Sequence, residues 1–255
     1  MTSLEPVHFT NLKQIALSPA HYLSAVQVGH HKKCFGAGRL LHFLVLGGNY
    51  VVYEGKRQGK AWKEFADAHQ GADIFTRAEV DREIAVANAV KNHPIAGPLL
   101  VGEHEREVEW EWMGRSCSSR LDVLGPRRVV DLKRAATAEP ERFARAAVRY
   151  GYHAQGAFYE AAAKHIGHEV DEVILIAVEP APPYAVTVFR LTRSALLVGQ
   201  KICRLWMERL LACEAANEWP EYVQSIVDLD VNEGPDLIFG DELDALADDA
   251  EEAAQ

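Results

Sequence analysis

The sequence has few cysteines and no long apolar run, and both absences exclude classes of protein. Its four cysteines lie at positions 34, 117, 203 and 213, with no Cys-x-x-Cys pair. This scatter argues against a zinc ribbon and predicts reduced thiols in a cytoplasmic protein. Because no apolar run reaches the roughly 18 residues that a membrane helix needs, we expect no membrane segment. The opening residues MTSLEPVHFTNLKQ lack a basic stretch followed by an apolar one, so we expect no secretory signal.

Basic residues are missing from the C-terminal end of the sequence. The formal net charge of −10 by itself disfavours a protein that binds nucleic acid. Of the 37 acidic residues, however, eleven lie in residues 228–255, which contain no Lys or Arg, so that 26 acidic residues stand against 27 basic ones elsewhere. We therefore expect an acidic, disordered tail and a near-neutral body, on which basic side chains can form a local patch for phosphates.

The remaining residues, 1–227, predict a single domain without internal repeats. Its N-terminal part, residues 1–104, has mainly helical apolar periodicity. Thr76 is the expected N-cap of the clearest amphipathic helix there. A further long helix is expected at residues 139–167, and a C-terminal helix at 192–218.

Strand patterns dominate the expected core at residues 105–191. Charged and apolar residues alternate from Arg106 to Met113, and two more strands follow, which predicts an antiparallel meander. The apolar run DEVILIAVEP predicts a central strand, and YAVTVFRL is expected to pair with it. Helices and strands in this order favour an α/β fold with a mixed five-stranded sheet flanked by helices.

Two aspartates and a lysine interrupt the apolar pattern of the expected hairpin RLDVLGPRRVVDLKRA. Strand interiors disfavour Asp, and a buried carboxylate is costly unless it is paired or bound to a metal. With a two-residue turn at residues 125–126, Asp122 lies opposite Val129. Because side chains alternate along a strand, this register puts Asp122 on the same face as Asp131 and Lys133.

Two carboxylates beside one ammonium group suit phosphodiester chemistry. Mg²⁺ binds carboxylate oxygens together with substrate phosphate, and it lowers the pKa of bound water. Lys133 can then orient that water or stabilise charge on the phosphate. Gln155 and Tyr159 lie one helical turn apart on the next helix and can hold the phosphate or Lys133. The alternatives are a surface hairpin with exposed ion pairs, since Asp-x-Lys alone is common, and a helix with one polar edge.

The order of these motifs resembles the PD-(D/E)XK nuclease superfamily. Within it, the sequence is most similar to the RecE-type (exodeoxyribonuclease VIII) C-terminal nucleases, relatives of lambda exonuclease and the RecB nuclease domain. The stretches that carry the resemblance are SPAHYL, GAGRLLHFLVL, SSRLDVLGPRRVVDLKRA, RFARAAVRYGYHAQGAFY and GQKICRLWMERLLACEAANEWP. The resemblance implies a restriction-endonuclease-like core.

The resemblance also implies roles for individual residues. His42, Asp122 and Asp131 match the residues that bind the metal, Mg²⁺ or Mn²⁺, and Lys133 matches the catalytic lysine. Without the resemblance, a core histidine on an apolar helix would be the preferred interpretation of His42.

Three further residues match the family pattern, and two depart from it. Gln155 and Tyr159 match the helix motif that follows the active hairpin. Arg120 matches the arginine of Arg-x-Asp, with a role open between phosphate contact and hairpin packing. Leu121 stands where proline is common, and Arg134 where threonine is common. We expect the second departure to be harmless, because Arg134 would point to the other face.

The function implied by the resemblance is a metal-dependent 5′-3′ exodeoxyribonuclease, a phosphodiester hydrolase. It would resect linear double-stranded DNA from its ends to leave 3′ single-stranded tails for a single-strand annealing protein. The resemblance also implies a cyclic homo-oligomer that threads DNA. The alternatives are another nuclease of the superfamily, either a RecB-like exonuclease with a four-cysteine iron–sulfur cluster or a structure-specific endonuclease, and an inactive DNA-binding scaffold.

Overall fold

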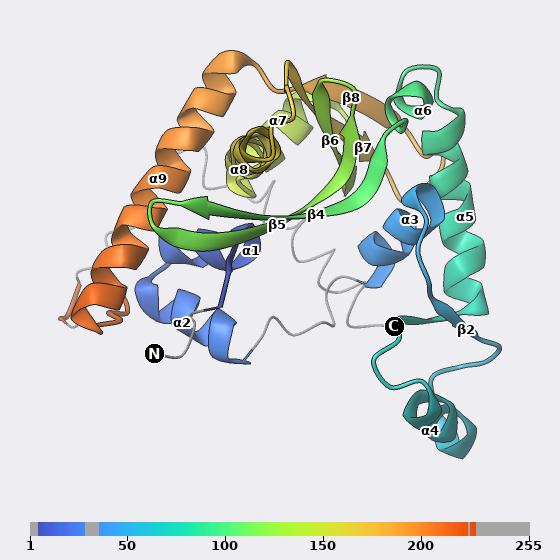
Figure 1. The fold of residues 1–255 in the computed structure, drawn as a ribbon. Helices are drawn as coiled ribbons and strands as arrows, with labels where there is room; N and C mark the ends of the chain where they lie inside the picture. The colour runs from blue at the N-terminus through green and yellow to red at the C-terminus, as the bar shows by residue number, and fades with distance from the viewer. Residues whose placement is uncertain (1–4, 29–35, 224, 228–255) are drawn as a thin grey trace.

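The computed structural model of the chain describes residues 5–28, 36–223 and 225–227, and Figure 1 shows their arrangement. In chain order the first elements are β1 (Val7–His8), α1 (Phe9–Leu12), the 3₁₀ helix η1 (Lys13–Ala16), α2 (Pro19–Val28), α3 (Gly36–Leu46), β2 (Val51–Tyr53), α4 (Gly59–Ala68), β3 (Ile74–Thr76) and α5 (Arg77–Asn92). They continue with α6 (Ala96–Leu99), β4 (Glu103–Trp112), β5 (Arg115–Gly125), β6 (Arg128–Arg134), α7 (Pro140–Arg149), α8 (Tyr152–His165), β7 (Glu172–Val178), β8 (Val186–Arg190) and α9 (Arg193–Ala216).

The main sheet has six strands in the order β1-β5-β6-β7-β8, with β4 paired to β5. Strands β4, β5 and β6 form the predicted antiparallel meander, β7 runs parallel to β6, and β8 runs antiparallel to β7. The predicted mixed sheet flanked by helices is therefore confirmed. It has a sixth strand because the two residues of β1 pair with β5.

Strand β5 changes its partner along one edge. Strand β4 follows the first edge over nearly the whole length of β5. On the second edge, β1 pairs with Cys117 and Ser118, whereas β6 pairs only with residues 123–125. Residues 119–122 therefore face a gap between two partner strands of the described sheet, and Asp122 lies at its end.

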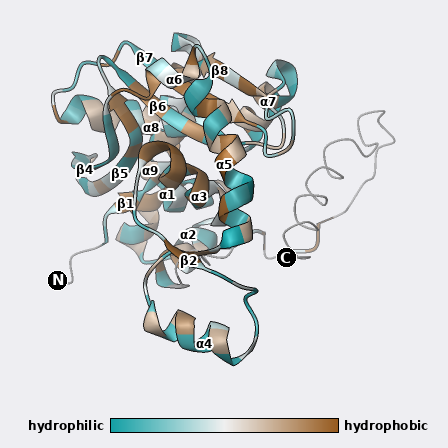
Figure 2. Cartoon of the chain, turned by 90° about the vertical axis from the view of Figure 1, so that its right-hand side faces the viewer, coloured by the Kyte–Doolittle hydropathy of each residue, from teal (hydrophilic) through white to brown (hydrophobic). Residues whose placement is uncertain are grey.

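Helices cover both faces of the sheet (Figure 1). On one face, Val130 and Leu132 of β6 pack in a buried cluster with residues of α3 and α5. On the other face, Val129 packs with Phe158 of α8. Since side chains alternate along β6, Asp131 and Lys133 point to the same side as Val129, toward α8. Figure 2 shows the resulting apolar interior beneath the more polar outer side of α5.

The segment predicted as one long helix at 139–167 is two helices, α7 and α8. The chain turns between them at Tyr150 and Gly151, and Gly151 has a left-handed φ of 73°. Glycine adopts this conformation without a steric penalty, so it ends α7 and redirects the chain. The break gives α8 its own direction across the sheet, with Gln155 facing Lys133.

The hairpin turn also differs from the predicted one. Gly125 pairs with Arg128, so that the two turn residues are Pro126 and Arg127. Proline suits the first central position of a turn because its φ is fixed near the required value. The register is displaced by two residues from the predicted one, and an even displacement keeps every side chain on its predicted face.

The capped helix predicted at Thr76 is confirmed. The Thr76 hydroxyl accepts a hydrogen bond from the Glu79 amide, and the Glu79 carboxylate accepts one from the Thr76 amide. A small parallel sheet of β2 and β3 precedes this helix, and α4 projects from the body between them (Figure 2). The acidic segment 228–255 and Cys34 lie outside the described residues. No described helix is long and apolar enough to cross a membrane.

The close approach of Gly199 in α9 to the backbone of α8 generates a stability prediction. A Cβ atom on Gly199 would lie 2.3 Å from the carbonyl oxygen of His153, so Gly199→Ala must push the two helices apart. We expect this substitution to lower the free energy of unfolding by about 1–3 kcal/mol in urea titrations. The control is Gly38→Ala in α3, where a Cβ meets no atom within 4 Å. Equal stability of the Gly199 variant and the wild type would contradict the packing argument.

Candidate active site

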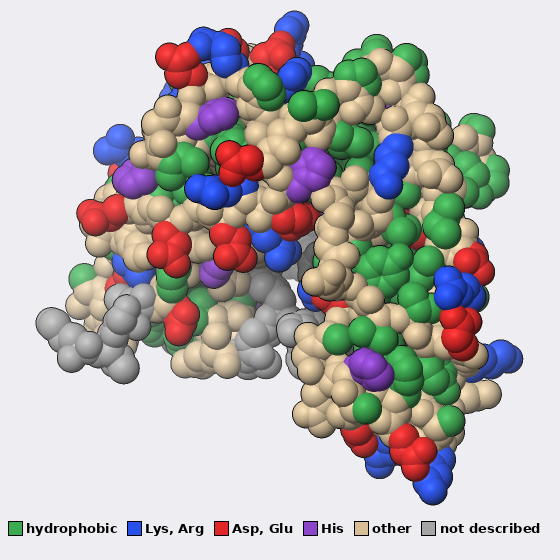
Figure 3. Space-filling view, turned by 45° about the vertical axis from the view of Figure 1, so that its right-hand side comes forward, with side chains coloured by type: hydrophobic (Ala, Val, Ile, Leu, Met, Phe, Trp, Pro, Cys, Tyr) green, Lys and Arg blue, Asp and Glu red, His purple; other side chains and the backbone are tan. Residues whose placement is uncertain are grey.

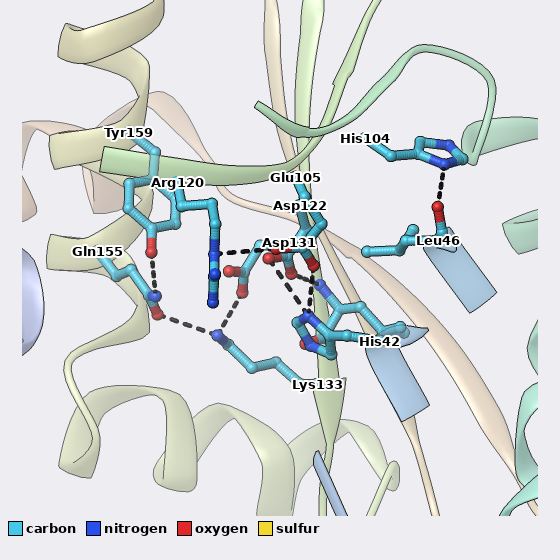
Figure 4. A network of polar contacts seen from close by, with 11 residues as sticks. His42, Leu46, His104, Glu105, Arg120, Asp122, Asp131, Lys133, Gln155 and Tyr159 are labelled. Carbon is cyan, nitrogen blue, oxygen red and sulfur yellow. Dashed lines mark hydrogen bonds and ion pairs between the residues drawn. The ribbon is translucent and has the colours of Figure 1, made fainter. Parts of the chain in front are cut away.

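Three neighbouring strands each bring one carboxylate to the gap in the sheet (Figure 4). Asp122 comes from β5 and Asp131 from β6, and their exposed fractions are only 7% and 3%. Glu105 comes from β4, between residues that pair with Leu121 and Val123, and so it lies across from Asp122. The gap therefore gathers three acidic groups in a part of the molecule where unpaired charges are costly.

The backbone of Leu132 connects these acids to α3. Its N–H donates a 2.7 Å hydrogen bond to Oδ2 of Asp122, and its carbonyl oxygen lies 3.1 Å from Nε2 of His42. A strand amide that has lost its ladder partner needs another acceptor, and the Asp122 carboxylate supplies it. The end of the β5–β6 ladder thus fixes both Asp122 and His42 against the backbone of one residue, Leu132.

His42 faces the carboxylates from the opposite side of the gap. Its Nδ1 lies 3.3 Å from a Glu105 oxygen and 3.6 Å from an Asp122 oxygen. Burial lowers the pKa of His42, but these two carboxylates outweigh burial and raise it to about 9. His42 is therefore an imidazolium near neutral pH, and it must lose a proton before it can bind a metal.

The two acids nearest His42 have opposite pKa shifts. Burial raises the pKa of Asp122 to about 6, although the positive charge of His42 opposes this. Burial also acts to raise the pKa of Glu105, but the hydrogen bond from His42 and the charge of Arg120 lower it overall. The less buried Glu105 thus carries the more stable negative charge.

Lys133 is held on the α8 side of the gap. Its Nζ lies 2.5 Å from Oδ2 of Asp131 and donates a 3.0 Å hydrogen bond to Gln155, which in turn donates to the Tyr159 hydroxyl. The same ammonium group lies 4.8 Å from the centre of the Tyr152 ring. Burial lowers the pKa of Lys133, but Asp131 and Asp122 outweigh it and raise the pKa overall. Lys133 is therefore a fixed cation.

Arg120 lies at the exposed rim of the cluster, with 59% of its side chain exposed. Its Nε is 2.9 Å from a Glu105 oxygen, and Figure 4 shows its guanidinium group between Tyr159 and the acids. Of the two roles left open by the sequence, hairpin packing does not fit this exposure. The position suits contact with a ligand that approaches the carboxylates.

The structure brings together all the residues expected at the site and adds one that sequence reasoning missed. The expected residues are His42, Arg120, Asp122, Asp131, Lys133, Gln155 and Tyr159. The addition, Glu105, belongs to a run of alternating glutamates that starts at Glu103, and the glutamates at 107, 109 and 111 are exposed on β4. Acidic, basic and histidine side chains gather on the face over β4 and β5 (Figure 3). A paired register for β4 and β5 was the only sequence signal that could have singled out Glu105.

The donor groups fit a hard divalent cation. Ligand atoms of His42, Glu105 and Asp122 all lie within 4.8 Å of one another. The buried Oδ2 of Asp131 has no hydrogen bond of good geometry, although the Lys133 ammonium lies beside it. Carboxylate and carbonyl oxygens with one imidazole are ligands that Mg²⁺ and Mn²⁺ accept.

The burial of Asp122 generates a prediction for the metal-free protein. A carboxyl group whose pKa is raised from 3.8 to about 6 costs stability as the pH rises through that range. In EDTA at pH 8, Asp122→Asn should therefore raise the free energy of unfolding, by at most about 3 kcal/mol, and the gain should vanish below pH 4. Asp131→Asn is the contrasting variant, because it leaves Lys133 buried without its partner and should lower stability. Urea titrations that show Asp122→Asn to be destabilising at pH 8 would contradict this account.

Comparison with known proteins identifies the family. Residues 8–227 match the family described as a PDDEXK-like domain of unknown function (DUF3799). The fold resembles the crystal structure of a protein from Eubacterium rectale described as "Putative exonuclease", with a TM-score of 0.62 and 13% identity, covering 89% of this chain and 91% of that chain. No curated protein matches the sequence. The match over most of the chain shows that the protein belongs to the PDDEXK-like family, and its mixed sheet has the fold of PD-(D/E)XK nucleases.

Proposed function

We propose that the protein is a metal-dependent 5′-3′ exodeoxyribonuclease that resects linear double-stranded DNA. The observation that carries the proposal is the placement of Lys133 between Asp131 and Gln155, at the gap where Asp122 and His42 converge. This arrangement sets a fixed cation next to a group of divalent-metal ligands. The ammonium group of Lys133 and a bound metal ion can then act on one phosphodiester from two sides.

Each residue has a part in this proposal. Mg²⁺ or Mn²⁺ would be held by Asp122, Asp131, His42 and the carbonyl oxygen of Leu132. When bound, the ion would polarise a phosphoryl oxygen and activate a water molecule. Lys133 stabilises negative charge that grows on the phosphate, because it stays protonated at neutral pH. Gln155 keeps the ammonium group in place.

The finer parts of the proposal rest on the family likeness. The resemblance to RecE-type nucleases supports attack from 5′ ends and a product with 3′ single-stranded tails. A single-strand annealing protein would then use these tails. The same resemblance supports a cyclic homo-oligomer, which would bring the basic side chains of a near-neutral body around one DNA duplex.

Two alternatives receive less support from the structure. An iron–sulfur RecB-like nuclease would need clustered cysteine ligands. Within the described residues, the one group with metal-ligand spacing contains no cysteine, and burial raises the pKa of both Cys117 and Cys203 to about 12. An inactive scaffold would be expected to lack one of the site residues, yet the described cluster keeps both aspartates and the lysine.

The function can be tested with a linear duplex labelled separately at its 5′ and 3′ ends, in Mg²⁺, beside closed circular DNA. We expect early release of the 5′ label from the linear duplex alone. Lys133→Ala and Asp131→Asn should each lower the rate at least about a hundredfold. Lys201→Ala, which changes an exposed lysine on α9, is the matched control and should leave the rate unchanged.

Other outcomes of this assay would select an alternative. Cleavage of closed circles would indicate an endonuclease. Early release of the 3′ label would indicate the opposite polarity of digestion, from 3′ to 5′. If the wild type cleaves no DNA in Mg²⁺ or Mn²⁺, the protein would be interpreted as an inactive DNA-binding scaffold and not as an enzyme.

A further inference from the structure

Glu105 has an unusual backbone for its position in a strand. Its φ is 49°, in the left-handed region that glutamate rarely adopts. The residues on either side pair regularly with β5, at Val123 and Leu121, so the irregularity is confined to Glu105. Backbone strain of this kind persists where the surrounding structure holds it, and it is concentrated at functional sites.

The carboxylate of Glu105 is shared between two cations. One oxygen lies 3.3 Å from His42 Nδ1, inside the cluster, and the other lies 2.9 Å from Arg120 Nε, at the rim. The side chain is 26% exposed and belongs to a half-buried residue, whereas the next glutamates on β4 are exposed. Glu105 therefore joins the group of candidate metal ligands to the exposed arginine Arg120.

We propose that Glu105 is an exchangeable ligand of the metal centre. In the metal-free protein it pairs with Arg120. When a divalent cation binds with His42 and Asp122, Glu105 becomes its ligand, and Arg120 is freed for a DNA phosphate. This inference rests on the proposed function.

Electrostatics favours the exchange. A doubly charged ion attracts a half-buried carboxylate more strongly than a guanidinium group of which more than half is exposed. The released guanidinium group can donate two parallel hydrogen bonds to a phosphate, a geometry that arginine provides and lysine does not. The exchange thus links occupation of the metal centre to the ability of the rim to hold DNA.

The exchange makes Arg120 a competitor of the metal, and this can be measured with Mn²⁺ alone. Calorimetric titration of the metal-depleted full chain should give about threefold to fivefold tighter Mn²⁺ binding in Arg120→Gln, since the pair lost is worth no more than an exposed salt bridge. Glu105→Gln should bind Mn²⁺ at least about tenfold more weakly. In the double variant the gain from Arg120→Gln should disappear.

Arg106→Gln is the matched control, because Arg106 is an exposed arginine next to Glu105 in sequence and pairs with Glu103. Equal gains from Arg106→Gln and Arg120→Gln would show a general charge effect and overturn the exchange. Unchanged binding in Glu105→Gln would also overturn it. If Glu105→Gln does not fold, as judged by circular dichroism, the comparison of the two arginine variants decides alone.

Two further binding measurements distinguish failure of this inference from failure of the proposed function. Asp131→Asn should lose Mn²⁺ binding; if it does not, the proposed metal centre fails rather than the exchange. In a Lys133→Ala background, which should not cleave, Arg120→Gln should weaken binding of a fluorescent duplex about threefold or more in Mn²⁺ and hardly at all in EDTA. An equal loss in both conditions would mean that Arg120 contacts DNA without being released by the metal.

Discussion

The hydrogen bond from the Leu132 amide to the Asp122 carboxylate is the contact on which the site depends. It occupies the place where β5 would otherwise continue to pair with β6, and so it keeps the sheet open at this point. Helix α3 lies on one face of the sheet and α8 on the other. At the opening, His42 from α3 lies beside Asp122, and Gln155 from α8 holds Lys133 beside Asp131. An unbroken sheet would separate them.

The charges at the opening balance in the metal-free protein. Three carboxylates face three cations, which are the imidazolium of His42, the ammonium of Lys133 and the guanidinium of Arg120. A divalent ion adds two positive charges, so its binding favours loss of the His42 proton and of the Arg120 contact. Lys133 remains, because Asp131 and the Gln155 amide hold it on the α8 side. The same burial that makes Asp122 costly without an ion makes it a strong ligand when an ion is present.

Much of this arrangement could be predicted from the sequence, because local patterns determine it. The alternation along β5 and β6 placed Asp122, Asp131 and Lys133 on the correct faces even though the turn was assigned one residue too early. What depends on tertiary contacts could not be predicted from local pattern. His42 was found only through the family resemblance, since nothing in an apolar helix shows that the sheet opposite is open. Glu105 was missed because it lies across from Asp122 only through the pairing of β4 with β5, and the pattern of β4 alone does not give that register.

The most direct test of this account is a crystal structure of the full chain with Mn²⁺, in which the anomalous signal locates the ion. The account predicts an ion at the sheet opening, bound by carboxylate oxygens of Asp122 and Asp131 together with the Leu132 carbonyl oxygen. The Leu132 amide should still donate to Asp122. An ion bound away from these residues, in protein that cleaves DNA, would contradict the claim that the opening between β5 and β6 forms the active site.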